Sequence, residues 1–301
     1  MRRKVNRVGN NTLTVSLPAK WANRYNIKQG DELEVNEQGS ALVVGSKDDS
    51  KWGKTKVDVE KFGLFHQNFL ANVYHVGYDE VEVLFRNSQD FENIQKRLPN
   101  FIGFEIVYQG EKSCVIKDIS KTSELEFDNV LRRTFLMLIE MSERCSDAIS
   151  KKEFDKLNEI RLLESMNNKF TDYCRRILNK YGYKDEKRTP VVYTLVHDLE
   201  RLGDEYKRIC DHFYKEKQPV NKDLLKLFQK INKYIRTYYE LFYKYDRAKL
   251  EYLLNEGKTI VKSLQTFLTS KSASDAILAH HLIYITIGVY DLTYTYVEMF
   301  I

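Results

Sequence analysis

The scarcity of chain-breaking residues most constrains what this sequence can fold into. Only 4 Pro and 13 Gly occur among its 301 residues, whereas all-β sandwiches and barrels need many turn residues. The sequence therefore predicts long helices joined by short connections. Because 43% of the residues are hydrophobic and 30% are charged, the chain can form packed cores beneath a charged surface. At this length we expect two or three domains.

Basic charge is concentrated at the N-terminus. Residues 1–30 contain seven Lys and Arg and no Asp or Glu, although the formal net charge of the whole chain is only +5. The first ten residues lack the apolar core of a secretion signal. The apolar stretch at residues 276–290 is shorter than the roughly 20 residues that cross a bilayer. We therefore expect a cytoplasmic protein without membrane insertion.

The four cysteines support the same location. Cys114, Cys145, Cys174 and Cys210 are scattered and form no C-x-x-C pair. This spacing fits reduced packing residues better than a disulfide framework or a zinc knuckle.

Strand and turn signals divide the first 120 residues into two parts. Residues 1–47, here called the head, carry four short strand signals and one short helix after Pro18. Residues 48–55 are polar and turn-rich, which predicts a linker. Residues 56–120, the middle module, mix strand and helix signals and predict an α+β fold. The head is too small to bury a core alone, so we expect a second copy to complete it.

Helical periodicity replaces the strand signals after residue 120. Breaks near residues 150, 181–190, 217–221, 246 and 270–274 divide residues 121–301, the helical body, into six helices. Their lengths and short connections suit an antiparallel bundle. The predicted fold is therefore multidomain: a small β head, an α+β middle module and an all-α six-helix body.

The head also carries a spaced set of residues beyond its basic run. These are Val8-Gly9-Asn10, Val15-Ser16-Leu17-Pro18, Trp21 and Arg24 of the short helix, and Ile27-x-x-Gly30-Asp31-x-Leu33-x-Val35. Over about residues 1–45 this pattern resembles the AbrB/MazE/SpoVT family. The resemblance implies a swapped-hairpin dimer whose first hairpins present basic side chains to double-stranded DNA. It predicts a homodimer or a higher even oligomer.

The basic residues of the head are the candidates for DNA contact. In a dimer they would create a dense positive field, and contacts to phosphates would release condensed counterions. Arg can also hold guanine edges bidentately. The alternative is a solvated basic tail, but the hairpin pattern favours DNA binding. The candidates are Arg2, Arg3, Lys4 and Arg7 on the first strand, Asn10 and Asn11 at the hairpin tip, and Lys20 and Arg24 on the short helix.

A stripe of acidic residues marks the third predicted helix of the body. At 100° per residue, Glu200, Asp204 and Asp211 lie within about 40° of one another, and His197 lies within about 60° of Glu200. Carboxylates on one face repel one another unless a cation offsets the repulsion, and hard or borderline metal ions suit them. The sequence thus offers a metal site on this helix.

Ion pairing is the competing explanation for this stripe. Arg201 and Arg208 could neutralise Glu200 and Asp204 with no metal present. The sixth predicted helix repeats the stripe more weakly, because apolar and aromatic residues interrupt it. Its candidate ligands are Asp291 and Glu298, with His280 on the same face and Tyr284 and Ile287 between them.

The run Leu199-Glu200-Arg201-Leu202-Gly203-Asp204, followed by Arg208-Ile209-Cys210-Asp211, resembles the signature of PhoU-type phosphate regulators. The resemblance spans about residues 121–301. It implies two related three-helix units and a Glu-x-x-x-Asp face that binds a divalent or trivalent metal ion such as iron, zinc or magnesium. In the sixth helix this motif is degraded. An AbrB-type head fused to a PhoU-type body resembles a regulator found in archaea.

These features predict a transcriptional regulator of phosphate uptake. Its dimeric head would bind operator DNA, and its body would sense a metal, a ligand or a partner protein. The alternative is a signalling adaptor that docks on a phosphate transporter component or another protein, with the head acting mainly in dimerisation. A metalloenzyme is the weakest hypothesis, because no His has a Glu three residues before it and no nucleophile motif is present. We expect a non-enzyme.

Overall fold

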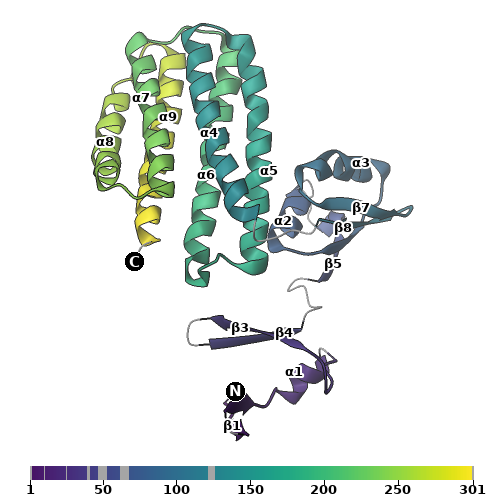
Figure 1. Ribbon diagram of the computed structural model, residues 1–301. Helices are drawn as coiled ribbons and strands as arrows, with labels where there is room; N and C mark the ends of the chain where they lie inside the picture. The colour runs from purple at the N-terminus through teal and green to yellow at the C-terminus, as the bar shows by residue number, and fades with distance from the viewer. Residues whose placement is uncertain are drawn as a thin grey trace. The chain divides into compact units, whose positions relative to one another are not determined.

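The chain divides into two compact units in the computed structural model. They comprise Met1–Gly53 and Lys54–Ile301, and Figure 1 shows the elements of each. The structure describes residues 2–9, 11–24, 26–38, 41–46, 53–61, 68–120 and 126–299.

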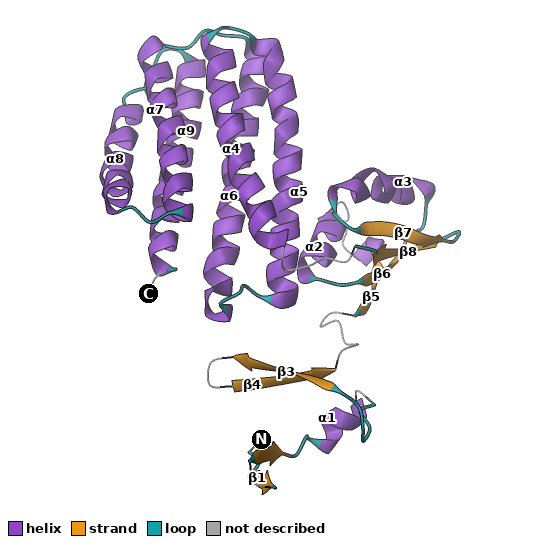
Figure 2. Cartoon of the chain, viewed as in Figure 1, coloured by secondary structure: helices purple, strands orange, loops and turns teal. Residues whose placement is uncertain are grey.

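The first unit consists of two antiparallel hairpins with a short helix between them in sequence (Figure 2). Its elements are β1 (Val5–Val8), β2 (Thr12–Val15), α1 (Ala19–Arg24), β3 (Leu33–Gln38) and β4 (Ala41–Ser46). At the tip of the first hairpin Gly9 has a φ of +67°, a left-handed conformation that Gly adopts without steric cost. The predicted order of hairpin, helix and hairpin is confirmed.

The first strand is shorter than the sequence predicts. Arg2, Arg3 and Lys4 precede β1, which begins at Val5. Continuing the register of Val5 with Val15 would set these residues opposite residues 16–18, where Pro18 has no N–H to donate. Pro18 instead accepts the first backbone hydrogen bonds of α1. The prediction that these three basic residues lie on the strand was therefore wrong.

Among its described residues the first unit buries no hydrophobic side chain. In the described part of the chain, no buried hydrophobic residue precedes Val57. Every residue of β1 and β2 is exposed, including Leu13, whose exposed fraction is 66%. Val35 and Leu42 of the second hairpin are also exposed. A single copy of the head thus presents apolar side chains that soluble proteins normally cover when they are clustered.

The middle module is a four-stranded sheet covered by helices. Strand order is β5-β6-β8-β7, with β5 and β6 parallel and the other pairs antiparallel. Alternate residues such as Val81, Val83, Cys114 and Ile116 are fully buried and form its core with Leu70. The α+β prediction is confirmed. The elements are β5 (Lys54–Asp58), α2 (Phe69–Val76), β6 (Glu80–Leu84), α3 (Ser88–Arg97), η2 (Leu98–Asn100), β7 (Phe104–Gln109) and β8 (Ser113–Asp118).

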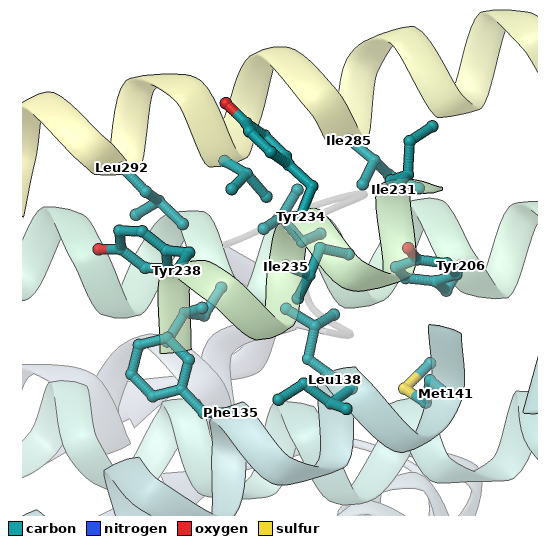
Figure 3. Packing of buried hydrophobic residues seen from close by; sticks show 14 of the residues in the cluster. Phe135, Leu138, Met141, Tyr206, Ile231, Tyr234, Ile235, Tyr238, Ile285 and Leu292 are labelled. Carbon is teal, nitrogen blue, oxygen red and sulfur yellow. The ribbon is translucent and has the colours of Figure 1, made fainter. Parts of the chain in front are cut away.

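The described part of the helical body contains six α-helices, as predicted. Within each of the two sets α4, α5, α6 and α7, α8, α9 the helices contact one another, and α6 with α9 and α4 with α7 join the sets. Figure 3 shows Phe135, Tyr206, Tyr238 and Leu292 among the residues of the shared core. The helices are α4 (Phe127–Ser150), α5 (Leu157–Tyr181), α6 (Thr189–Glu216), α7 (Lys222–Tyr243), α8 (Arg247–Gln265) and α9 (Ala273–Glu298), with η4 (Phe154–Lys156) and η5 (Glu186–Arg188) between them.

Side-chain caps fix where the last three helices begin. Asn221, Asp246 and Ser272 each accept a hydrogen bond from a backbone N–H in the first turn of α7, α8 and α9. Such caps satisfy donors that have no partner within the helix. Local chemistry thus explains the predicted breaks near these positions. The related three-helix units of a PhoU-type fold stay a prediction.

The middle module and the helical body belong to one compact unit, because side chains of α5 form hydrogen bonds and ion pairs with the module. The guanidinium of the fully buried Arg176 donates to the carbonyl oxygens of Tyr74 and Tyr78, each at 2.9 Å. It also donates to the Asp118 carboxylate at 2.8 Å. His75 and Asp172 contact each other at 2.5 Å nearby. The hydrophobic cores remain separate clusters, and the predicted domain boundaries stay a prediction.

By length and composition alone, α9 could cross a membrane. This is weak evidence, because the core helix of a soluble protein passes the same test. Leu282, Ile285 and Leu292 of α9 are fully buried in the core of the body, which accounts for much of its apolar character. The expected cytoplasmic location stays a prediction.

Candidate nucleic-acid interface and acidic helix faces

The β1-β2 hairpin gives Arg7 a defined setting. Arg7 lies opposite Leu13, and Val5 lies opposite Val15. Because alternate strand residues point to opposite faces, these four side chains share one face of the hairpin. The other face includes Thr14, whose hydroxyl donates to the carbonyl of Asn6 at 3.3 Å. Arg7 is therefore a cation beside exposed apolar side chains.

Four further basic candidates are also exposed. Arg2, Arg3 and Lys4 lie just before β1, and Lys20 lies on α1. None of these four, nor Arg7, forms an ion pair in the described part of the chain, so their charges are free for phosphate groups. Asn11 is exposed in the turn before β2, Arg24 is the last residue of α1, and Asn10 lies outside the described residues.

The acidic stripe of α6 meets cations from α5. Arg175 donates to the Glu200 carboxylate at 2.8 Å. The Nδ1 atom of His197 lies 3.9 Å from the same carboxylate oxygen. Asp211 lies 2.5 Å from the Nε of Arg161. Ion pairing therefore offsets part of the stripe, but through α5 rather than through Arg201 and Arg208.

The predicted pairing of Arg201 and Arg208 with the stripe was wrong. Arg201 lies 3.8 Å from Asp198, and Arg208 pairs with Glu205. Both arginines therefore contact carboxylates three residues earlier on α6. The i,i+3 spacing brings side chains together on one helix face.

The predicted metal ligands do not converge in this structure. Asp211 is three helical turns from Glu200, which is about 16 Å along the axis. Among the described residues no group of three or more His, Cys, Asp or Glu side chains could hold a metal ion. Glu298 is exposed at the end of α9. As arranged, these donors do not fit one shared ion, and metal binding stays a prediction.

One predicted acidic residue does face a second one. A cavity of about 300 Å³ between α6 and α9 is lined by Asp198, Arg201, Tyr284 and Asp291, among others. Burial raises the pKa of Asp198. The negative charge of Asp291 also raises it, whereas His197 and Arg201 lower it by a smaller amount than burial raises it. Burial also raises the pKa of Asp291. Sequence reasoning missed Asp198, because only the packing of α6 on α9 distinguishes it from other helix-surface carboxylates.

Comparison with known families identifies the first unit. Residues 7–52 match the model of the family described as antidote-toxin recognition MazE, bacterial antitoxin. No curated protein matches the chain. The chain therefore has a MazE/AbrB-type domain at its N-terminus and a helical C-terminal body. Arg7, Asn11, Lys20 and Arg24 fall within the matched segment, whereas Arg2, Arg3 and Lys4 precede it.

The matched domain carries a general functional meaning. MazE-type domains typically form dimers and bind DNA, so this domain indicates a DNA-binding or antitoxin-like regulator. The match does not extend to the helical body. The PhoU-type body, the link to phosphate, the transporter partner and the archaeal source therefore stay predictions.

Proposed function

We propose that the protein is a transcriptional regulator that binds DNA as a dimer through its MazE/AbrB-type domain. The observation that carries the proposal is the exposed apolar surface of a strongly basic head. Leu13 and Val15 are 66% and 51% exposed in one copy, and a second copy would cover them. Burial of such side chains contributes about 1.5 to 3 kcal/mol each.

The basic charge of the head supports the proposal that it binds DNA. A dimer would double the number of unpaired basic side chains at the head. Each phosphate that they neutralise releases counterions, so affinity is expected to fall steeply with salt. Arg7 is the strongest candidate, because it lies in β1 within the matched segment. It shares its face with Leu13 and Val15, so in the dimer its aliphatic stem would pack against the covered apolar side chains while its guanidinium stays in water at the edge of that face.

The helical body would supply the regulatory signal. Coupling requires two conformations of the body that differ in how they favour the DNA-bound head. A metal ion, a small ligand or a partner protein such as a phosphate transporter component would serve as the signal. The assignment to phosphate uptake rests only on the resemblance of Leu199 to Asp211 to the PhoU signature. The adaptor alternative uses the same body and leaves the head only a dimerising role.

A second candidate is an antitoxin-like regulator, which the description of the matched family favours. In this case the chain would also bind a second protein. A pull-down with the intact chain and with a variant carrying Arg7→Ala distinguishes the two activities. Protein binding that survives loss of DNA binding favours this candidate or the adaptor.

Titration of a labelled duplex with the full chain at rising salt tests the proposal. The logarithm of the affinity should fall linearly with the logarithm of salt concentration. Arg7→Ala in both copies should reduce the slope by about 1.8 and weaken binding at least tenfold at about 50 mM salt. The matched control is Arg247→Ala, which removes an exposed arginine of the body. No binding at low salt, or equal binding by both variants, would contradict the proposal.

A further inference from the structure

Two of the four cysteines meet inside the helical body. The thiol of Cys210 on α6 donates to the sulfur of Cys145 on α4 at 3.7 Å. Both side chains are fully buried, at 0% exposure. Cys114 and Cys174 are buried as well, but neither forms a hydrogen bond to another thiol in the described part of the chain. Cys145 and Cys210 therefore form a dithiol, whereas the other two are single thiols.

The sulfur atoms of this dithiol are close to the geometry of a disulfide. Because a disulfide bond is about 2.05 Å long, the two sulfurs would have to approach each other by about 1.7 Å. Rotation about the two Cα–Cβ bonds, with a small shift of α4 against α6, would supply this movement. Reacting atoms held about 3 to 3.5 Å apart react far faster than molecules that must first meet. Closure of the bond is therefore favoured once one sulfur is activated.

Burial controls which oxidant reaches the dithiol and how fast it reacts. It raises the pKa of the Cys145 thiol well above its usual value, and the thiolate is the reactive form. Large oxidants and protein disulfides do not reach a fully buried sulfur while the helices stay packed. A small, uncharged oxidant such as hydrogen peroxide enters when the core opens locally. The first oxidation step is therefore slow, and it selects for peroxide.

We propose that Cys145 and Cys210 form an oxidisable pair that hydrogen peroxide converts into a disulfide between α4 and α6. In the first step one sulfur attacks a peroxide oxygen, the O–O bond breaks, and hydroxide leaves with the thiol proton as water, so that a sulfenic acid remains. The second sulfur then attacks the first, the S–O bond breaks, and hydroxide leaves with the second thiol proton as water. Two thiols lose two electrons in all, and one peroxide is reduced to two waters.

The disulfide would lock one part of the helical body. Residues 145–210 include the whole of α5, so the bond would close a loop that contains this helix. A cross-link restricts the open states of the segment that it encloses. Because α5 also holds the middle module through Arg176, the lock would act on the helix to which the module is attached. It requires neither DNA binding nor a second copy of the chain.

Peptide mapping of the full chain after exposure to hydrogen peroxide tests the pair. The remaining thiols are alkylated in denaturant, and the chain is digested without reductant. A linked peptide that joins Cys145 to Cys210 should be at least about tenfold more abundant than any other linked pair, because only these two thiols are in contact. Cys145→Ala should abolish the link. The matched control is Cys174→Ala, which removes an equally buried thiol and should keep the link. In the chain unfolded by urea before oxidation, the preference for this pair should disappear.

Hydrogen exchange then measures the lock. Amides of α5 should exchange at least about fivefold more slowly in the oxidised chain than in the reduced chain, and dithiothreitol should restore the original rates. Met166, which is 46% exposed, reports the dose of peroxide by forming its sulfoxide. Once Met166 is oxidised, Cys145 and Cys210 that still react fully with the alkylating reagent, or that carry oxygen without a linked peptide, would overturn the proposal. A linked peptide with unchanged exchange in α5 would overturn the lock.

Discussion

The head and the helical body treat apolar side chains in opposite ways. In the head Leu13 is 66% exposed, whereas in the body Leu202 is 1% exposed and Leu199 is fully buried. The body buries most of its large hydrophobic side chains within one chain. A single copy of the head leaves such side chains exposed. If a second copy covers them, as we propose, the stability of the head should depend on protein concentration. The comparison shows that one chain can combine a helical body with an extensive buried core and a head whose described hydrophobic residues are not buried.

Basic residues show the same contrast. Arg7 in the head is exposed and pairs with no carboxylate in the described part of the chain. Arg176 in the body is fully buried and donates to two carbonyls and a carboxylate. The charge of this buried guanidinium is compensated by the Asp118 carboxylate, although its Nε atom has no hydrogen-bond partner among the described residues. The first arginine is therefore available for a ligand, and the second belongs to the architecture.

The largest effect is expected for Arg176→Met. The substitution leaves Asp118, whose side chain is 4% exposed, without its cation. Loss of one partner of a buried pair costs about 3 to 5 kcal/mol. Thermal unfolding should shift down by roughly 10 °C. The matched control is Arg144→Met, which breaks only exposed pairs with Glu140 and Glu159 and should cost less than about 1 kcal/mol. Equal shifts for both variants would remove the contrast between buried and exposed arginines.

Leu13→Asp tests the apolar surface of the head. If a second copy covers Leu13, the charge is buried at the interface and should destabilise the dimer by about 2 to 3 kcal/mol per protomer. Light scattering over a dilution series measures the dimer. Leu162→Asp changes a similarly exposed leucine of α5 and should alter stability by less than about 0.5 kcal/mol. A dimer unaffected by Leu13→Asp would show that the head does not pair through this face.

The contacts of Glu205 predict that the stability of the helical body depends on pH. Burial alone would raise the pKa of this carboxyl, but hydrogen bonds from His281 and Arg208 outweigh it and hold the pKa below its usual value. The stability that the Glu205 carboxylate contributes is therefore fully present above the pKa that Glu205 has in the unfolded chain. It is lost as pH falls through the lower pKa that Glu205 has in the folded protein. Glu205→Gln should lower the free energy of unfolding by about 1 to 3 kcal/mol at pH 7. The free energy of unfolding of this variant should also depend less on pH.

Urea unfolding of both proteins between pH 7 and pH 3 measures the dependence on Glu205. The difference between wild type and Glu205→Gln should shrink steadily toward pH 3. A difference that stays constant over this range would mean that the carboxylate charge is not the source of the stability.

The smallest effect is expected for Gly257→Ala in α8. A Cβ there would lie 2.5 Å from the Tyr234 hydroxyl, which donates to the Leu253 carbonyl at 2.8 Å. Overpacking costs about 1 to 3 kcal/mol, and the gain in helix propensity returns about 1 kcal/mol. We expect a net loss of about 1 kcal/mol in urea unfolding. The control is Gly45→Ala in the head, where an added Cβ meets nothing within 4 Å, so this substitution should not destabilise the protein. A larger loss of stability for Gly45→Ala than for Gly257→Ala would contradict the contrast between a tightly packed body and an open head.

Local signals in the sequence predicted most of the fold but little of the acidic sites. The helix breaks follow caps such as Asn221 and Asp246, which act within four residues. The start of the first strand depends on its register with the segment that ends at Pro18, and the predicted start was wrong. The pairing of Arg175 with Glu200 and the approach of Asp198 to Asp291 join different helices. Helical periodicity places residues on a face but does not say which helix that face meets.

The mass of the full chain in complex with a labelled duplex shows whether two chains bind one DNA molecule. Light scattering at low salt should give two chains per duplex. At high salt the DNA should dissociate while the protein keeps twice the mass of one chain. A particle with the mass of a single chain, with or without DNA, would contradict the account.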